Sequence, residues 1–195
     1  MTRTPEQADL ILAHQIERRA QLDGARDVVT FENGDHPDEV RTYRMLWDNG
    51  RRVASALTGE GLVKGERFAL LLQNHPEFVD TMVGSSVAGT VFVPIDPRTK
   101  GDKLVYMLVH SGCRGVVCAD YNLAHVIEVL DRAPQVEWIW VVGHPAAMPF
   151  PAHPLRVRSF ASVLAVPVPE MAIQADDPAD VMQIMYTSGT TGDPK

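Results

Sequence analysis

The ten residues that decide the fold of this chain are Tyr186-Thr187-Ser188-Gly189-Thr190-Thr191-Gly192-Asp193-Pro194-Lys195. They follow an apolar run over residues 181–185 that has the length and composition of a buried strand. A strand therefore leads into a loop that combines glycines, hydroxyl side chains and a lysine. Glycine permits positive φ, which turns successive backbone N–H groups toward one point, and the hydroxyls and the ammonium group add donors and charge. Such a loop can wrap a polyphosphate.

Two interpretations of this loop are open when it is considered alone. A loop rich in serine, threonine and glycine is usually a solvated turn, and Gly-Thr-Thr-Gly by itself favours neither a turn nor a phosphate site. The loop is not a Walker A motif, because Gly-Lys-Ser/Thr is missing and Lys195 follows a proline. The rest of the chain must therefore decide.

The chain before the loop alternates between strand-like and helix-like segments. Apolar runs begin near residues 68, 91, 115 and 138, and helix-like segments lie between them at 76–88, 101–110 and 123–132. Repeated strand–helix–strand units form parallel sheets, and strands that are apolar throughout have helices on both faces. We therefore expect a layered α/β/α fold with a mainly parallel sheet, whose strands lie near residues 68–72, 91–95, 115–118, 138–142 and 181–187.

Two regions depart from this alternation. Near the N-terminus, Thr4-Pro5-Glu6 predicts a helix start, and residues 28–31 and 40–42 predict short strands around the turn at 33–35. Thr42 is placed to cap the helix that follows. Residues 143–169 contain six prolines, which predict a surface excursion with one short helix at 160–164.

Composition and charge exclude several classes of protein. The net charge of −7, without a basic stretch, argues against a nucleic-acid partner. We expect a cytoplasmic protein, because the N-terminus lacks the features of a signal peptide and no apolar stretch approaches the length of a membrane span. The only cysteines, Cys113 and Cys118, lack metal-ligand spacing, so we expect buried free thiols and no metal site. The seven scattered histidines are expected to be surface or capping residues.

The loop and two earlier stretches together resemble the adenylate-forming (AMP-binding) superfamily, which includes acyl-CoA synthetases, aryl-CoA ligases, luciferases and peptide-synthetase adenylation domains. The first stretch covers residues 42–46 and 52–57 and continues through 64–78, and the second covers 88–97. We interpret both of these as structural, with Gly89 allowing a tight crossing. The resemblance extends from about residue 27 to residue 195, as though the chain were the N-terminal part of a large AMP-binding domain whose C-terminal part and lid domain are absent.

The resemblance implies a two-step reaction in the parent protein. A carboxylic acid reacts with ATP, assisted by Mg²⁺, to give an acyl-adenylate and pyrophosphate, and a thiol, usually that of coenzyme A, then displaces AMP. It also implies which residues of the loop hold the ATP phosphates: Thr187, Ser188, Gly189, Thr190, Thr191, Gly192 and Lys195. No catalytic residue and no metal ligand are expected within this chain, so the chain alone is expected to be inactive and to bind ATP no tighter than the millimolar range.

Alternatives to the acyl-CoA ligase are a peptide-synthetase-type adenylation domain and a non-catalytic α/β interaction module. Thr190 favours an acyl-CoA or aryl-CoA ligase, because peptide-synthetase domains often carry serine at that position. The interaction module would bind through the unfinished edge of its sheet, and the same edge would permit self-association. We further expect residues 187–195 to be mobile or to be held by a neighbouring chain.

Overall fold

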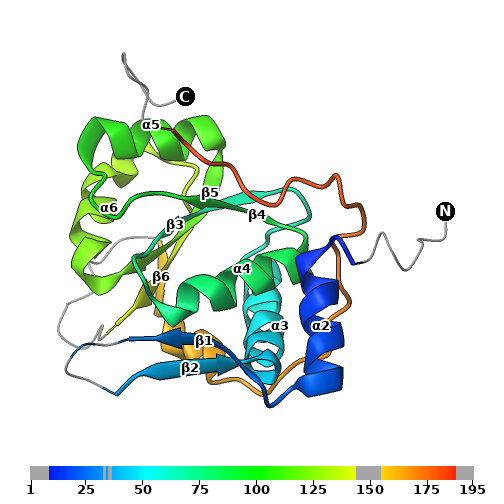
Figure 1. Cartoon of the computed structure of the whole chain (residues 1–195). Helices are drawn as coiled ribbons and strands as arrows, with labels where there is room; N and C mark the ends of the chain where they lie inside the picture. The colour runs from blue at the N-terminus through cyan, green and yellow to red at the C-terminus, as the bar shows by residue number, and fades with distance from the viewer. Residues whose placement is uncertain (1–8, 33, 35–36, 144–154, 188–195) are drawn as a thin grey trace. The chain divides into compact units, whose positions relative to one another are not determined.

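A computed structural model describes residues 9–32, 34, 37–143 and 155–187, and the chain divides into two compact units (Figure 1). The first unit comprises residues 1–65, 74–90 and 166–182. The second comprises residues 66–73, 91–165 and 183–195. The predicted helix start at residues 4–6 and most of the predicted turn at 33–35 lie outside the described residues.

Among its described residues, the first unit has three helices and a β-hairpin. Its helices are α2 (Leu12–Asp23), α3 (Tyr43–Gly59) and α4 (Pro76–Ala88), and its antiparallel strands are β1 (Asp27–Phe31) and β2 (Glu39–Thr42). The predicted cap of α3 is confirmed, because the Thr42 hydroxyl accepts a hydrogen bond of 3.2 Å from the backbone N–H of Met45.

Helices α3 and α4 approach each other closely at two glycines. A methyl group in place of the hydrogen at Gly50 would overlap the side chain of Val83, and one at Gly84 would overlap Val53. Helix α4 ends at Gly89, which has φ of +68° and so adopts the left-handed conformation that glycine tolerates best.

A buried carboxylate connects three elements of the first unit. Asp80 of α4 is fully buried, and its carboxylate accepts hydrogen bonds from Arg41 Nε of β2 at 3.2 Å and from Asn49 Nδ2 of α3 at 3.1 Å. Burial raises the pKa of Asp80 to about 6, although the Arg41 charge and the two hydrogen bonds oppose that rise. One carboxylate therefore links the hairpin to two helices.

Residues 166–182 run along the first unit without a helix or strand. The backbone N–H of Gln174 donates to the Val87 carbonyl at 2.7 Å, and Arg52 Nε donates to the Val166 carbonyl at 2.8 Å. Lys64 bonds to Asp176 and to Asp180, and its Nζ lies 2.7 Å from Asp180 Oδ2. Backbone and ionic contacts therefore hold this segment in place.

The second unit is built on a parallel sheet in the order β4-β3-β5-β6-β7, in which every neighbouring pair is parallel. The strands are β3 (Arg67–Leu71), β4 (Val91–Pro94), β5 (Cys113–Ala119), β6 (Trp138–Val142) and β7 (Arg156–Ser159). The α/β class with a mainly parallel sheet is therefore confirmed.

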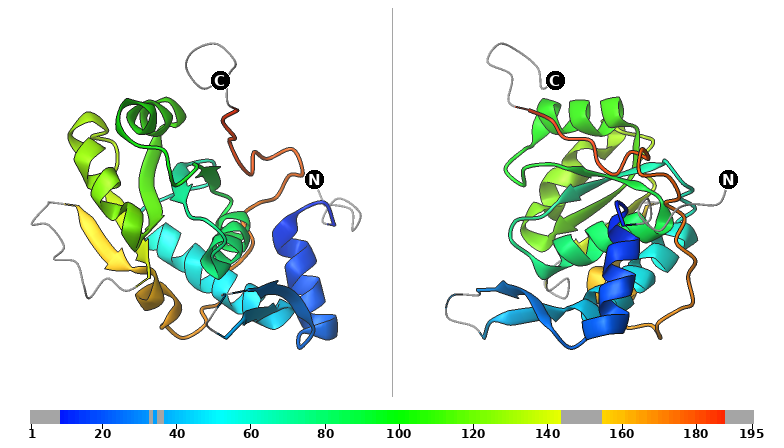
Figure 2. Two further views of the ribbon diagram at one scale, coloured as in Figure 1. Left: turned by 60° about the vertical axis from the view of Figure 1, so that its left-hand side comes forward. Right: turned by 45° about the vertical axis from the view of Figure 1, so that its right-hand side comes forward.

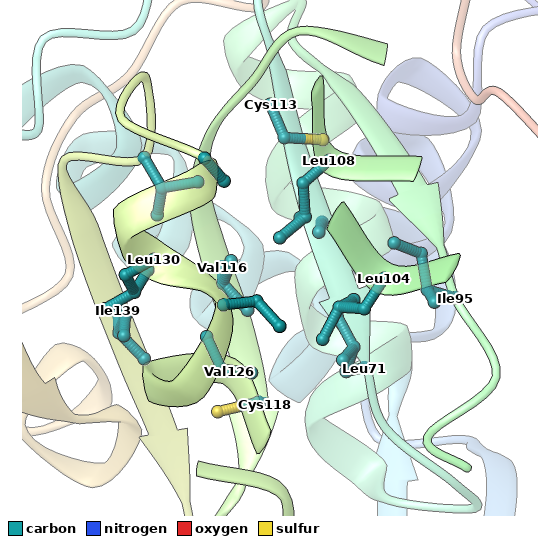
Figure 3. Close-up of a cluster of buried hydrophobic side chains, with 14 of the residues drawn as sticks. Leu71, Ile95, Leu104, Leu108, Cys113, Val116, Cys118, Val126, Leu130 and Ile139 are labelled. Carbon is teal, nitrogen blue, oxygen red and sulfur yellow. The ribbon is translucent and has the colours of Figure 1, made fainter. Parts of the chain in front are cut away.

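Two helices, α5 (Gly101–Ser111) and α6 (Leu123–Val129), lie beside each other against this sheet (Figure 2). Helix α6 continues into a short 3₁₀ turn, Leu130–Arg132, and a further helix, α7 (Phe160–Leu164), follows β7. Figure 3 shows Leu104 and Leu108 of α5 and Val126 of α6 meeting Val116 and other strand residues in the core. All of these side chains are fully buried, so hydrophobic burial stabilises this unit.

Two strand predictions need correction. Residues 181–187 do not form a strand: Gln183 makes an isolated parallel bridge with Phe92, and the neighbouring Met185 side chain is 64% exposed. Conversely, β7 lies within the segment that was predicted to be a surface excursion. Its apolar content is low, because Arg156 and Arg158 flank Val157, so no apolar run marks it in the sequence.

The thiols of Cys113 and Cys118 are free and buried, as predicted. None of the helices in the described part of the chain is long and apolar enough to cross a membrane.

Candidate functional site

The structure describes the approach to the predicted phosphate-binding loop and its first residue, Thr187, which is exposed. The other predicted phosphate-binding residues, and with them the prediction about the order of residues 187–195, lie outside the described residues: Ser188, Gly189, Thr190, Thr191, Gly192 and Lys195. The geometry of the site is therefore that of the segment leading into the loop and of its surroundings in the second unit.

The approach runs beside β4. Gln183 pairs with Phe92 in parallel orientation, and the backbone N–H of Ile184 donates to the Phe92 carbonyl at 3.2 Å. The segment therefore runs in the same direction as the strands of the sheet. In open α/β sheets, ligands bind outside the carboxyl ends of the strands, toward which this segment runs.

Tyr186, just before the loop, forms an aromatic cluster with two residues of α5. The Tyr186 hydroxyl lies 2.8 Å from His110 Nδ1 and 3.3 Å from the Met107 carbonyl oxygen, both on α5. The Tyr106 ring stacks on the His110 ring with a centroid separation of 5.1 Å. Burial raises the pKa of the Tyr186 phenol.

His110 is a residue whose role the sequence analysis missed. It was expected to be a surface or capping residue, and it is exposed, but it also contacts a side chain 76 residues away in the sequence. One signal was available: Tyr106 and His110 are four residues apart on a predicted helix, a spacing that places two side chains together on one face.

A pocket of about 300 Å³ lies within the second unit, next to the carboxyl ends of three adjacent strands. Its residues follow β3, β4 and β5 in the sequence, and its lining consists of Gln73, Pro97, Arg98, Lys100, Tyr121, Asn122 and His125. The sequence analysis did not predict it, although polar and basic residues follow each of these strands. Because the carboxyl ends of parallel strands share one edge, that pattern could have revealed it.

The chemistry of this pocket favours an anion. Asn122 is only 4% exposed, and its Nδ2 has no hydrogen-bond partner within the described part of the chain. Lys100 adds an ammonium group, and Arg98 adds a guanidinium that pairs with Asp96 at 2.6 Å between Nη2 and Oδ2. That pairing lowers the pKa of Asp96 to about 2. A buried amide donor without a partner is costly, so a bound acceptor would satisfy it.

Comparison with known proteins gives consistent matches. A model of a family described as AMP-binding enzyme matches residues 16–195. The 4-hydroxybutyrate–CoA ligase 2 of Metallosphaera sedula is 29% identical over 159 residues, which are 81% of this chain and 29% of that protein. The long-chain-fatty-acid–CoA ligase FadD13 of Mycobacterium tuberculosis is 31% identical over 166 residues, with the same shares of the two chains.

Among solved structures, the anthranilate CoA ligase AuaEII in complex with anthranoyl-AMP superposes with a TM-score of 0.80. It is 23% identical, and the match covers 96% of this chain and 33% of that one, so it shows the fold. The chain spans about three tenths of the length of the curated relatives it matches.

Proposed function

This chain belongs to the AMP-binding enzyme family, and from that premise we propose that it is the N-terminal part of an ATP-dependent acid–CoA ligase. The observation that carries the proposal is the glycine- and hydroxyl-rich loop that begins at Thr187. It follows a segment parallel to β4 in a chain whose relatives include CoA ligases. The ligase identity of the whole protein is part of the proposal, since the chain spans only a part of those relatives.

In the proposed first step, an oxygen of the substrate carboxylate attacks the α-phosphorus of ATP, and the bond to the β-phosphate oxygen breaks. The products are an acyl-adenylate and pyrophosphate. The loop donors would hold the β- and γ-phosphates and orient the leaving pyrophosphate: Thr187, Ser188, Gly189, Thr190, Thr191, Gly192 and Lys195. In the second step the thiol of coenzyme A attacks the acyl carbon, AMP leaves, and a thioester forms.

Mg²⁺ would supply charge neutralisation for the ATP phosphates. The loop offers hydroxyl oxygens and N–H donors, which suit the phosphates better than the cation. No group of three His, Cys, Asp or Glu side chains that could hold a metal occurs among the residues described. The contribution that we propose for this chain is to bind and orient phosphate.

The pocket beside Lys100 and Asn122 supports the coenzyme A part of the proposal. Coenzyme A carries several phosphates, and the pocket offers a buried amide donor and two cationic side chains at the edge where ligands of α/β sheets bind. We propose that this pocket receives a phosphate of coenzyme A.

The first experiment tests phosphate binding by the loop. ATP and tripolyphosphate are titrated into the 195-residue chain, and binding is followed by NMR at the amides of residues 184–195. We expect a dissociation constant in the millimolar range, and a further weakening of about threefold or more in Lys195→Ala, because a charge-assisted hydrogen bond is lost. Lys103→Ala, which removes an exposed lysine from α5, is the matched control and should bind as the unaltered chain does.

The outcome that would overturn the loop assignment is equal binding by Lys195→Ala and the unaltered chain, or shifts that occur away from the loop. Micromolar ATP binding, or pyrophosphate release with any acid, would instead contradict the expectation that the chain alone is an incomplete enzyme.

The second experiment tests the pocket. Adenosine 3′,5′-bisphosphate, which represents the phosphorylated end of coenzyme A, should shift the side-chain amide signal of Asn122 and should bind more weakly to Lys100→Ala than to Lys103→Ala. Equal binding by the unaltered chain, Lys100→Ala and Lys103→Ala would favour the peptide-synthetase alternative. In that alternative a carrier-protein thiol replaces coenzyme A, and the first step stays the same.

The non-catalytic interaction module remains the second candidate, and one observation favours it. Met185 is 64% exposed next to the short pairing with β4, which leaves apolar surface at this edge of the sheet. A chain that self-associates and binds neither ATP nor tripolyphosphate would support this candidate over the ligase.

A further inference from the structure

The segment that leads into the predicted phosphate-binding loop makes two kinds of hydrogen-bonded contact with the second unit. The first is the backbone bond from Ile184 to Phe92, which extends the sheet by a single bridge. The second is the Tyr186 side chain, which reaches α5. Because the backbone pairing is a single bridge, the Tyr186 side chain contributes to fixing the backbone next to Thr187.

The hydrogen bonds of Tyr186 can be assigned a direction. A phenol has one proton, and the Met107 carbonyl can only accept, so the Tyr186 hydroxyl donates to Met107 at 3.3 Å. In the tautomer with its hydrogen on Nδ1, His110 donates to the same hydroxyl oxygen at 2.8 Å. The result is a chain of two hydrogen bonds from the histidine ring through the phenol to the backbone of α5.

The rings hold this arrangement in place. Tyr106 stacks on His110 with an interplanar angle of 15°, and it meets the Tyr186 ring edge-on with centroids 6.2 Å apart. The His110 and Tyr186 rings are also edge-on, with centroids 5.8 Å apart. Such pairs add stabilisation beyond the area they bury, so the histidine presents its Nδ1 in a fixed direction.

We propose that Tyr186 and His110 are positioning residues that fix the backbone at Thr187 and thereby set the affinity of the loop for polyphosphate. The inference rests on the proposed function, because it assigns a role within the same phosphate site. Consecutive Cα atoms are about 3.8 Å apart, so the anchored residue lies directly next to the first residue of the loop. A loop whose start is fixed in advance loses less conformational freedom on binding, and its affinity is higher for that reason.

Four variants of the full 195-residue chain test this. Tyr186→Phe removes the hydroxyl and keeps the ring, and His110→Ala removes the donor. His110→Asn places an amide nitrogen near the position of Nδ1 and should rescue. Tyr106→Phe removes a hydroxyl from the same cluster but retains the stacking ring, which makes it the matched control.

The first readout is the dissociation constant for tripolyphosphate, measured by NMR. We expect Tyr186→Phe and His110→Ala to weaken binding about two- to tenfold, which corresponds to the loss of one hydrogen bond. His110→Asn should recover most of that loss, and Tyr106→Phe should bind as the unaltered chain does. The thermal midpoint should change little in all four variants, since His110 is exposed and no fully buried side chain is replaced.

The second readout needs no ligand. Hydrogen exchange at the Ile184 amide should accelerate in Tyr186→Phe and His110→Ala and stay unchanged at Leu70, in the middle of the sheet. If the unaltered chain does not bind tripolyphosphate, the proposed function fails, and exchange at Ile184 alone decides whether the anchor exists. If tripolyphosphate binds but the affinity and the exchange are the same in every variant, the positioning role is overturned.

Discussion

The two units differ in whether a buried carboxylate takes part in their packing. In the first unit, a buried carboxylate, Asp80, joins a hairpin to two helices through hydrogen bonds to Arg41 and Asn49. In the second unit, the centre is apolar, and side chains such as Leu108 and Val116 fill the space between helices and sheet (Figure 3). Titration of the buried carboxylate makes the stability of the first unit depend on pH, whereas burial of apolar side chains in the second unit does not depend on protonation.

The largest effect should come from opening a cavity in the second unit. Trp138 is fully buried and packs against Phe68 and Trp140, with ring centroids 6.0 and 4.8 Å apart. Trp138→Ala should lower the free energy of unfolding by about 3–5 kcal/mol, through lost burial and an unfilled cavity. Hydrogen exchange at Val116 should show this loss equally at pH 5 and pH 7. A loss that depended on pH would remove the contrast between the two units.

A smaller and pH-dependent effect should come from Asp80. Its pKa of about 6 in the folded state lies above the ordinary value of 3.8, so the folded state binds the proton more tightly than the unfolded state does. The stabilisation from this proton is fully present below pH 4 and is lost as the pH rises through 6. As the pH rises from 4 to 7, we expect the titration of Asp80 to lower the free energy of unfolding by about 1–3 kcal/mol.

The free energy of unfolding of the unaltered chain and of Asp80→Asn is measured with denaturant at pH 4, 5, 6 and 7. Hydrogen exchange at amides of α3 and α4 is the readout. In Asp80→Asn the free energy of unfolding should not show this decline between pH 4 and pH 7. The plots of free energy against pH for the two proteins should therefore be parallel at the acidic end, although their values differ there. Parallel curves over the whole range would mean that Asp80 does not titrate in this window. Asp96 does not contribute to this change, because its pKa of about 2 lies below the range from pH 4 to pH 7.

The smallest effect should come from the cap of α3. Thr42→Ala removes the acceptor for the Met45 N–H and should cost about 1 kcal/mol. Thr42→Ser, which retains the hydroxyl, should cost less than half of that. Both are measured by thermal unfolding, with exchange at the first amides of α3 as the local readout. An equal cost for the two variants would assign the effect to the lost methyl group instead of to the cap.

The sequence predicted the helices and most strands of both units because their signals are local. Pro76 at the start and Gly89 after the end define α4, and the apolar run at 138–142 gives β6 its observed bounds. Strand β7 was not predicted because its arginines interrupt any apolar run. The strand prediction for residues 181–187 was wrong because strand formation also needs a partner strand, which the local sequence does not specify.

The site was less predictable than the fold. The loop stands out through its own residue types, but the contact between His110 and Tyr186 joins residues that are distant in sequence. The pocket beside Lys100 requires three strand ends to meet at one edge. Both depend on the order of strands in the sheet, which no single segment specifies.

The two native thiols also determine how the molecule can be labelled. Burial raises the pKa of both Cys113 and Cys118 to about 12, so neither is a thiolate at neutral pH, and a maleimide reagent reacts with the thiolate. The two native thiols should therefore not react with thiol-specific probes at neutral pH. One cysteine introduced on an exposed turn would be the single reactive thiol, and pairs of such positions, one in each unit, would allow fluorescence or spin-label distances without removing either native residue.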